Sequence, residues 1–359
     1  MKLSSLPYIL RKLVLDHMSI NQIFFLSLCS KNTKNLIILT QKNQLKKVEQ
    51  VNYWIDGKKN TIIDMKMVTS ADPHAFMFFF KTPAGFSKKV IGGKDRGTVE
   101  EVRLNELGTS IIFFRFPSLT DLHAKYSSDN LESIIERIHD QLYDLLGHHT
   151  KFWSGWIPGG KTPFLPMLRN IRGLEVSGTA FATTTIDEYL SRATCLEYFF
   201  YNVPLRQTIE FEKCSRIYEL DTVEVWAARQ LPRDVMKYFN GRHAFLDCFS
   251  VSTSDIIQFL NSWESGEKFR NLEVISIINK FRVPDIRRSV EFKKLNKKIK
   301  YSYVRKFKRG VPITHHEFKT RSYLVRESDG HVASVLLSSE MVKMGVWNMT
   351  EEEFLKKFQ

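Results

Sequence analysis

The hydrophobic and polar residues at the start of the chain follow the spacing of helices. Pro7 suits the first turn of an opening helix, and Ser19 can cap a second helix that begins near Ile20. Asn32 or Thr33 can start a third helix. The apolar residues of this segment are too many for one small helical unit to bury: Leu6, Ile9, Leu10, Leu13, Val14, Ile20, Ile23, Phe24, Phe25, Leu26, Leu28, Leu36, Ile37 and Ile38. We therefore expect it to complete its core against a second polypeptide.

A second pattern, a leucine followed directly by an acidic residue, recurs through the middle of the chain. The pairs are Leu174-Glu175, Leu196-Glu197, Leu220-Asp221, Leu246-Asp247 and Leu272-Glu273. In the three clearest copies, apolar residues follow the leucine by three and five positions. This spacing and the period of the pairs are typical of leucine-rich-repeat strands, although the usual asparagine is missing. We predict a divergent, leucine-rich-repeat-like strand–helix solenoid over about 116–280, with one side of each strand exposed on a concave face.

Helical spacing lies between these predicted strands. Residues 185–188 have the spacing of a capping box, and Asp234 precedes a group of apolar residues. Thr253 or Ser254 precedes an apolar stripe that ends at Trp263. Alternating strands and helices make the chain an α/β protein.

The flanking regions have weaker patterns. Residues 43–115 contain dense apolar runs separated by glycine turns and are predicted to form a β-rich connecting region. Asp329-Gly330 lies between two apolar runs and predicts a C-terminal hairpin that covers the edge of the last solenoid strand. Residues 341–359 are expected to be a C-terminal tail.

Three segments at the amino end resemble the F-box, in the form found in the large nematode-expanded F-box family. They are Leu6-Pro7, Met18-Ser19-Ile20 and the run LSLCSKNTK from Leu26 to Lys34. The resemblance implies a three-helix F-box over 1–42 that docks onto a Skp1-like adaptor and, through it, a cullin-RING ubiquitin ligase. The alternative is an ordinary helical cap on the following domain. Candidate adaptor contacts, several of which must also serve the F-box core, are Leu6, Pro7, Leu10, Val14, Met18, Ile23, Leu26 and Leu28.

Two further segments, Phe259–Gly266 and Arg326–Val335, are similar to the type-2 F-box-associated domain. In that family the domain follows an F-box, and the resemblance implies that residues 116–340 recognise a protein substrate. Candidate substrate-binding residues on the predicted strands and loops are Glu175, Glu197, Tyr198, Asp221, Glu224, Asp247 and Glu273. The repeated acids have an alternative role, which is to satisfy backbone N–H groups at strand ends.

Composition limits the class of protein. A chain of 359 residues with 43% hydrophobic content is globular and has ample core. No window is apolar enough for a membrane span, and the N-terminus does not resemble a signal peptide. The four cysteines lack zinc-ligand spacing and are expected to be buried thiols of a protein in the cytoplasm or the nucleus. We predict no metal and no cofactor.

One motif suggests different chemistry. Gly155 to Thr162 matches the phosphate-binding pattern G-x-x-x-x-G-K-T. Residues 148–151 are a poor buried strand, and Pro166 would block the helix that such a loop requires. A surface loop rich in glycine and proline is the preferred interpretation, and a nucleotide-binding enzyme is a distant alternative.

Residues 280–309 carry 13 Lys or Arg and two acids, which accounts for most of the net charge of +14. This segment can be a solvated surface, a contact for an acidic partner, or a nucleic-acid-binding or nuclear-import segment. Nucleic acid ranks last because no reader motif accompanies the charge.

No catalytic constellation is present in the sequence. The expected function is therefore that of a non-catalytic substrate-recognition subunit of an SCF-type (Skp1-cullin-F-box) E3 ubiquitin ligase, which acts by proximity. The alternative is a non-catalytic protein- or nucleic-acid-binding scaffold that uses the basic 280–309 segment.

Overall fold

The computed structural model describes residues 5–56, 61–67, 76–81, 98–104, 109–115, 122–125, 131–157, 166–177, 183–202, 210–226, 229–305 and 314–358. The chain forms two compact units, residues 1–172 and 173–359. The boundaries expected at residues 42, 115 and 340 do not coincide with the boundary between these units. Mixed α/β structure, with amino-terminal helices followed by strand-rich sheet, is as predicted.

The first unit begins with four helices. They are α1 (Tyr8–Asp16), α2 (Ile20–Cys29), α3 (Lys31–Thr40) and the short α4 (Lys42–Leu45). Ser19 caps α2 as predicted, and its hydroxyl accepts from the N–H of Gln22, whose side chain in turn accepts from the N–H of Ser19. The cap of α3 is Ser30 rather than Asn32 or Thr33, because the Ser30 hydroxyl accepts the Thr33 N–H at 3.1 Å.

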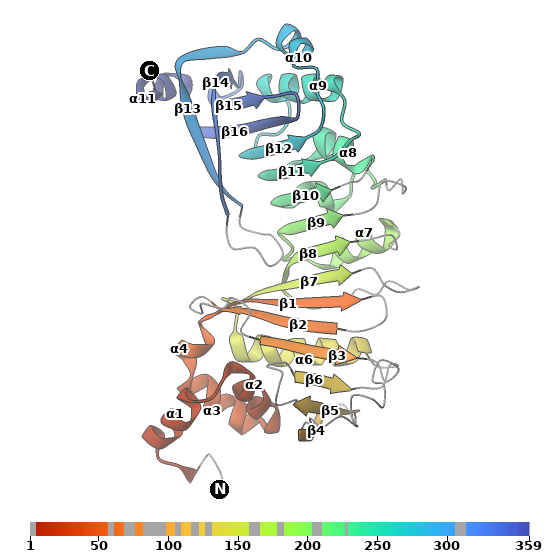
Figure 1. Ribbon diagram of the computed structural model, residues 1–359, viewed down its shortest axis with the longest axis vertical. Helices are drawn as coiled ribbons and strands as arrows, with labels where there is room; N and C mark the ends of the chain where they lie inside the picture. The colour runs from red at the N-terminus through yellow and green to blue at the C-terminus, as the bar shows by residue number, and fades with distance from the viewer. Residues whose placement is uncertain are drawn as a thin grey trace. The chain divides into compact units, whose positions relative to one another are not determined.

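A sheet and one long helix complete the first unit (Figure 1). The strands are β1 (Val48–Asp56), β2 (Thr61–Met67), β3 (Phe76–Lys81), β4 (Thr98–Leu104), β5 (Thr109–Arg115), β6 (Leu122–Lys125) and β7 (Lys151–Ile157), and the helix is α6 (Leu131–Leu146). Their order is β7-β1-β2-β3-β6-β5-β4. Within 43–115, the described residues include the strands β1 to β5. Strand β6 pairs with β3 and β7 pairs with β1, so the structure does not confirm an uninterrupted solenoid from residue 116.

The second unit contains five parallel strands with helical segments between them. The elements are β8 (Ile171–Ser177), α7 (Thr183–Arg192), β9 (Tyr198–Asn202), the 3-10 helix η4 (Arg216–Glu219), β10 (Thr222–Trp226), α8 (Leu231–Tyr238), β11 (His243–Asp247), α9 (Thr253–Glu264) and β12 (Val274–Ile278). The helices expected near 185, 234 and 253 are present. Ser252, not Thr253 or Ser254, caps α9, in a capping box with Asp255.

The strand register corrects the predicted repeat at two of its five copies. Tyr198, Thr222, His243 and Val274 pair in succession across β9 to β12. Leu196, Leu220 and Leu272 therefore occupy equivalent positions, two residues before their strands. Leu174 and Leu246 instead lie inside β8 and β11. Gly241, two residues before β11, occupies the position that is equivalent to the three leucines.

The carboxyl-terminal part of the chain extends this sheet with antiparallel strands. They are β13 (Lys293–Arg305), β14 (Thr314–Val325), β15 (His331–Leu337) and β16 (Met341–Thr350), with α10 (Val283–Ser289) before them and α11 (Glu351–Phe358) after them. The hairpin of β14 and β15 is confirmed, and Gly330 in its turn has φ of +72°. The edge of β12 is covered by β16, from the predicted tail, and not by that hairpin.

Candidate functional site

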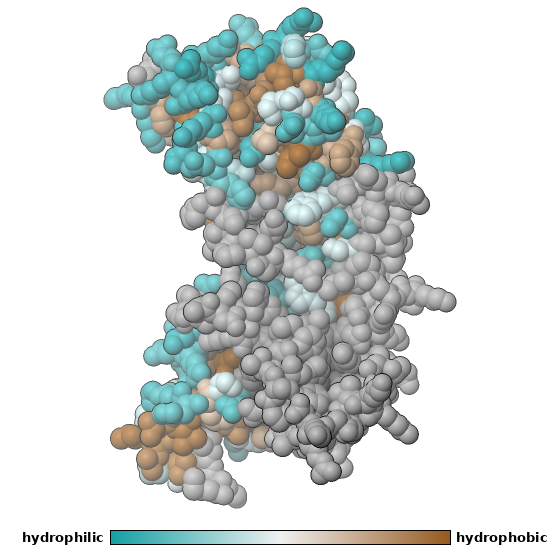
Figure 2. Space-filling model, viewed as in Figure 1, coloured by the Kyte–Doolittle hydropathy of each residue, from teal (hydrophilic) through white to brown (hydrophobic). Residues whose placement is uncertain are grey.

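An exposed apolar face lies on the first helix of the chain (Figure 2). Its residues are Tyr8, Ile9, Leu10, Leu13 and Val14, and α3 exposes a further leucine, Leu39. Ile9 is 77% exposed and Leu39 is 80% exposed. Leu15, in contrast, is fully buried, which orients α1 against the other helices. A helix that exposes so much apolar surface favours an interface with a partner.

The candidate adaptor residues divide into three groups by exposure. Pro7, Leu10 and Val14 are exposed, and Leu6, Met18, Leu26 and Leu28 are half-buried. Ile23 is fully buried, so in the isolated chain it serves the F-box core, as several of the candidates were expected to do. Contact with an adaptor stays a prediction for the others. The candidate list lacked Tyr8, Ile9, Leu13 and Leu39, although the dense apolar pattern of the opening helix was the signal for most of them.

The helical unit is held to the rest of the first unit by α6. Helix α2 packs against α6, and the Lys34 ammonium lies 2.9 Å from the Asp144 carboxylate. Behind this contact, His139 of α6 is buried between Tyr53 and Phe152 of the sheet. The exposed face of α1 is therefore presented by helices with a packed core.

In the second unit, three of the candidate substrate-binding residues are buried. Glu175, Tyr198 and Glu224 are each at most 5% exposed, and the Tyr198 hydroxyl donates to the Glu224 carboxylate at 2.9 Å. Phe245, which pairs with Glu224 in the next strand, is covered by Tyr303 of β13, at a ring distance of 6.0 Å. The face predicted to be open is thus covered, at β11, by the chain's own β13–β14 hairpin.

The remaining acids lie at strand ends, most of them in one row. Glu197, Asp221 and Glu273 each precede a strand by one residue, and Arg242 occupies the equivalent position in β11. Asp247 lies at the opposite end of β11. The Arg242 guanidinium lies 2.5 Å from Glu273 and 3.5 Å from Asp221, and His243 also contacts both acids. A hydrogen bond from His243 lowers the pKa of the Asp221 carboxyl. Asp221, Arg242 and Glu273 of this row are therefore paired charges.

A polar pocket of about 730 Å³ adjoins this row. Its walls come from strand starts, from the loop before β12, from β13 and from β14 to β16. The residues that line it are Glu219, Asp221, Asn240, Gly241, Arg242, Arg270, Asn271, Leu272, Glu273, Tyr301, Arg326, His331, Val346 and Asn348. Asp221 and Glu273 are the two candidate substrate residues that the structure brings together here.

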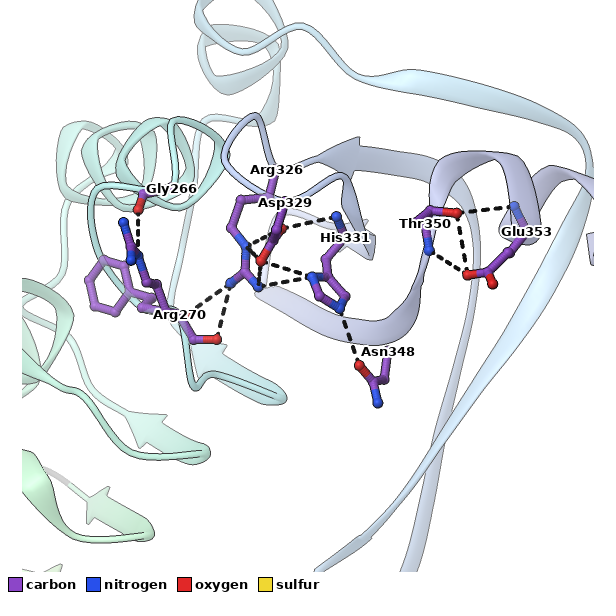
Figure 3. Close-up of polar contacts among 9 residues, drawn as sticks. Gly266, Arg270, Arg326, Asp329, His331, Asn348, Thr350 and Glu353 are labelled. Atoms are coloured by element: carbon purple, nitrogen blue, oxygen red, sulfur yellow. Dashed lines mark hydrogen bonds and ion pairs between the residues drawn. The ribbon is translucent and has the colours of Figure 1, made fainter.

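Arg326 lines this pocket, and Figure 3 shows its polar contacts. Its guanidinium is 4% exposed and donates to the Asp329 carboxylate at 2.7 Å and to the carbonyls of Phe269 and Arg270. It also lies over the Trp263 ring, 5.3 Å from the centroid. The two segments that resemble the F-box-associated domain therefore meet in space, because Trp263 belongs to one and Arg326 to the other.

The phosphate-loop motif has an unsuitable geometry at its first residue. Gly155 lies within β7, and its missing side chain makes room for the Trp54 ring, which would lie about 2.1 Å from an added Cβ. Residues 158–165, which contain the rest of the pattern, lie outside the described residues. The described part of the basic segment forms α10 and β13, so it is folded as a helix and a strand.

Two of the four cysteines differ from their expected burial. Cys248 is buried, Cys195 is half-buried, and Cys29 and Cys214 are exposed. Cys29 lies on the last turn of α2, opposite the residues that form the helical core.

Comparison with known proteins identifies the helical segment. Among the described residues, no helix has the length and apolar character needed to cross a membrane. No curated protein and no solved structure matches the chain. Residues 3–42 match the family model of the F-box domain, so the chain carries an F-box at its amino end.

Proposed function

We propose that this protein is a non-catalytic substrate-recognition subunit of an SCF-type ubiquitin ligase. The F-box match at residues 3–42 is the observation that carries the proposal. F-box domains suggest an adaptor role in such ligases, in which the F-box binds a Skp1-like protein and, through it, a cullin-RING ligase. Its catalytic contribution would be proximity, because it holds a target lysine near the charged conjugating enzyme. Such ligases act in the cytoplasm and the nucleus.

The exposed face of α1 supports this docking role. Ile9, Leu10 and Leu13 are each at least 49% exposed and lie on a helix whose buried side is already occupied by Leu15. Burial of a large apolar side chain at an interface contributes roughly 1.5–3 kcal/mol. This helix therefore has both the chemistry and the free surface that a partner helix requires.

The second unit is the part that we assign to target binding. Its two segments similar to the type-2 F-box-associated domain pack together around Arg326. Its parallel strands with intervening helical segments are compatible with a divergent leucine-rich-repeat-like solenoid. A rigid sheet suits recognition because it holds surface side chains in fixed positions.

Co-purification with a Skp1-like adaptor tests this function. The full chain is expressed with the adaptor, and Ile9→Asp and Leu10→Asp are compared with the unaltered protein. We expect each variant to reduce capture at least about tenfold, because a carboxylate is desolvated at an apolar interface. Phe249→Asp is the matched control, since Phe249 is 73% exposed and belongs to the second unit.

The control should retain the adaptor, and all three variants should melt as the unaltered protein does. Capture by the Ile9 and Leu10 variants at the level of the Phe249 variant would contradict the proposal. If the adaptor is captured as expected, affinity purification with and without proteasome inhibition would identify a short-lived target.

A further inference from the structure

The β13–β14 hairpin has two different faces. Ile299, Tyr301 and Phe318 are buried, and Tyr301 and Phe318 belong to one cluster with Phe245 and Val274 of the parallel strands. The alternate residues Lys300, Ser302, Glu317, Lys319 and Arg321 are exposed. Side chains alternate along a strand, so one face of the hairpin packs on the sheet and the other faces solvent. We call the second one the outer face.

The outer face and its margin are strongly basic. The two strands carry eight Lys or Arg and one acid, Glu317. Glu317 pairs with Lys300 at 3.0 Å. Among the described residues, Lys297, Lys298, Lys319 and Arg321 have no carboxylate within ion-pair distance. The hairpin therefore presents cationic groups whose charge is not neutralised by any carboxylate of the described residues.

One of these unpaired cations, Lys319, lies opposite another lysine of the hairpin. Lys300 lies directly across from Lys319 in the register of β13 and β14. Like charges at directly opposite positions of an antiparallel pair destabilise it. Arg321 follows Lys319 on the same face. A bound anion would relieve this repulsion.

Protection of a sheet edge explains only part of the charge. Strand β13 is the edge of the described sheet, and lysines on an edge strand prevent pairing with other chains. Lys297 and Lys298 of β13 fit that role, since they lie where the register shifts between Lys294 and Ile299. Lys319 and Arg321 do not belong to this edge strand, because they lie on β14, which pairs with β13 at Lys319 and with β15 from Tyr323 to Val325.

We infer that the outer face of the β13–β14 hairpin binds an extended acidic segment of a target protein, an inference that rests on the proposed function. Alternate residues of an extended segment are about 6.6–6.8 Å apart, the same as Lys319 and Arg321 along β14. The open edge of β13 also offers backbone groups with which such a segment pairs. The face covered by this hairpin was the predicted site for a target, and the outer face replaces it.

The aromatic residues distinguish this partner from a single-stranded nucleic acid. Proteins that bind single strands stack bases on exposed aromatic rings among the cations. Here Tyr301 and Phe318 are buried, and Tyr303 stacks on Phe245 and His316. In its described part, the outer face offers charge without an exposed aromatic ring for stacking, which favours a polypeptide with carboxylates.

Direct binding to the purified full chain tests the inference. The probe is a fluorescent peptide of about 12 residues with Glu at alternate positions and Ser between them. We expect binding that weakens with salt and that falls at least about tenfold in the double variant Lys319→Glu, Arg321→Glu. The matched control is Arg282→Glu, Arg288→Glu on α10, which changes the net charge equally at residues that are 86% and 80% exposed. It should weaken binding by less than about threefold.

A stability measurement separates loss of binding from loss of fold. The single variant Lys319→Glu faces Lys300 with an opposite charge, so its melting temperature should stay the same or rise while peptide binding falls. Equal losses in both double variants would overturn the inference, because they would show an effect of net charge alone. Tighter binding of a single-stranded DNA of equal charge, in competition with the peptide, would also overturn it.

The adaptor assay is independent of this outcome. Ile9→Asp should bind the peptide as the unaltered protein does, since the substitution lies on α1 of the other unit. Loss of selective peptide binding with intact adaptor capture would refute the inferred peptide-binding role of the basic outer face alone. If the adaptor is not captured but selective peptide binding is intact, the ligase role would be refuted and the inferred role of the outer face would stand.

Discussion

The hydroxyl of Tyr53 lies 2.9 Å from Nδ1 of His139, in the core of the first unit. The other ring nitrogen of His139, Nε2, lies 2.7 Å from the carbonyl oxygen of Arg169. A carbonyl only accepts, so Nε2 carries the proton and donates, and Nδ1 accepts from Tyr53. The two contacts therefore fix one neutral tautomer of a histidine that is 1% exposed.

This arrangement predicts a loss of stability in mild acid. Burial lowers the pKa of His139 to about 4, from an ordinary value of 6.5. Between these values the unfolded chain binds a proton that the folded chain does not, so stability falls as pH falls from 6.5 and levels off below 4. This difference in pKa corresponds to a loss of free energy of unfolding on the order of 3 kcal/mol. Denaturant unfolding across this pH range, for the unaltered protein and for His139→Gln, measures it.

The comparison variant isolates the histidine from the carboxylates that titrate in the same range. His139→Gln keeps polar atoms for Tyr53 and Arg169 and has no titrating ring, so its stability should depend less steeply on pH. If the free energies of unfolding of the two proteins changed in parallel with pH, His139 would already be protonated in the folded state, contrary to the assigned tautomer.

Gly155→Ala is predicted to destabilise the first unit through a steric overlap with Trp54. The Trp54 ring would lie about 2.1 Å from the added Cβ, and both residues belong to paired strands, β1 and β7. Overpacking of this kind costs typically 1–3 kcal/mol. Thermal and denaturant unfolding of Gly155→Ala measure the cost.

A double-mutant cycle tests the cause of that loss. In a Trp54→Leu background the ring is absent, so Gly155→Ala should then cost only a few tenths of a kcal/mol. An equal cost in both backgrounds would show that the backbone at residue 155, and not the Trp54 ring, requires glycine.

The sequence pattern located the three helices at the amino end and those near residues 185, 234 and 253, but it did not predict α6, α10 or α11. It also misplaced two strands of the repeat. Leu246 satisfied the leucine–acid pattern, yet β11 begins at His243, because Gly241 and not a leucine occupies the equivalent position. An added Cβ at Gly241 would meet the Leu220 carbonyl oxygen at 1.8 Å, so the close approach of two backbones excludes the expected residue. A periodic pattern carries no information about such a contact.

The candidate site was predicted only where local chemistry decides it. The F-box residues could be identified because their spacing is local. The cover over Phe245 could not, since Tyr303 reaches it from 58 positions along the chain. The pairing of Arg242 with Asp221 and Glu273 depends in the same way on strand order. Because such contacts are non-local, the sequence analysis predicted that residues which are buried or ion-paired in the structure would be exposed.

Asp329→Ala is predicted to destabilise the second unit by roughly 1–3 kcal/mol, because it removes the carboxylate partner of a buried guanidinium. Arg326 keeps two carbonyl acceptors in this variant, and Asp329 is 35% exposed, so the loss is smaller than for a fully buried pair. Chemical denaturation at neutral pH measures it. Glu327→Ala, at the exposed neighbouring residue, should change stability by less than about 0.5 kcal/mol.

The pH dependence gives a second measure of the same pair. The hydrogen bond from Arg326 holds the pKa of the Asp329 carboxyl well below its usual range. Its contribution to the free energy of unfolding is present above pH 3.8 and is lost as pH falls further. The difference in free energy of unfolding between Asp329→Ala and the unaltered protein should therefore narrow in acid. A gap that is constant down to strongly acidic pH would mean that the charge of Asp329 is not what stabilises Arg326.

The four cysteines are predicted to react with thiol reagents at different rates. Cys29 and Cys214 are exposed, whereas Cys248 is 1% exposed and burial raises its pKa to about 12. Thiolate is the reactive form, so Cys248 should remain unmodified in the folded protein near pH 8 while Cys29 and Cys214 react within minutes. Mass spectrometry of peptides after timed alkylation assigns each residue. Denatured protein should react at all four positions, and early modification of Cys248 under native conditions would show that the segment after β11 opens readily in solution.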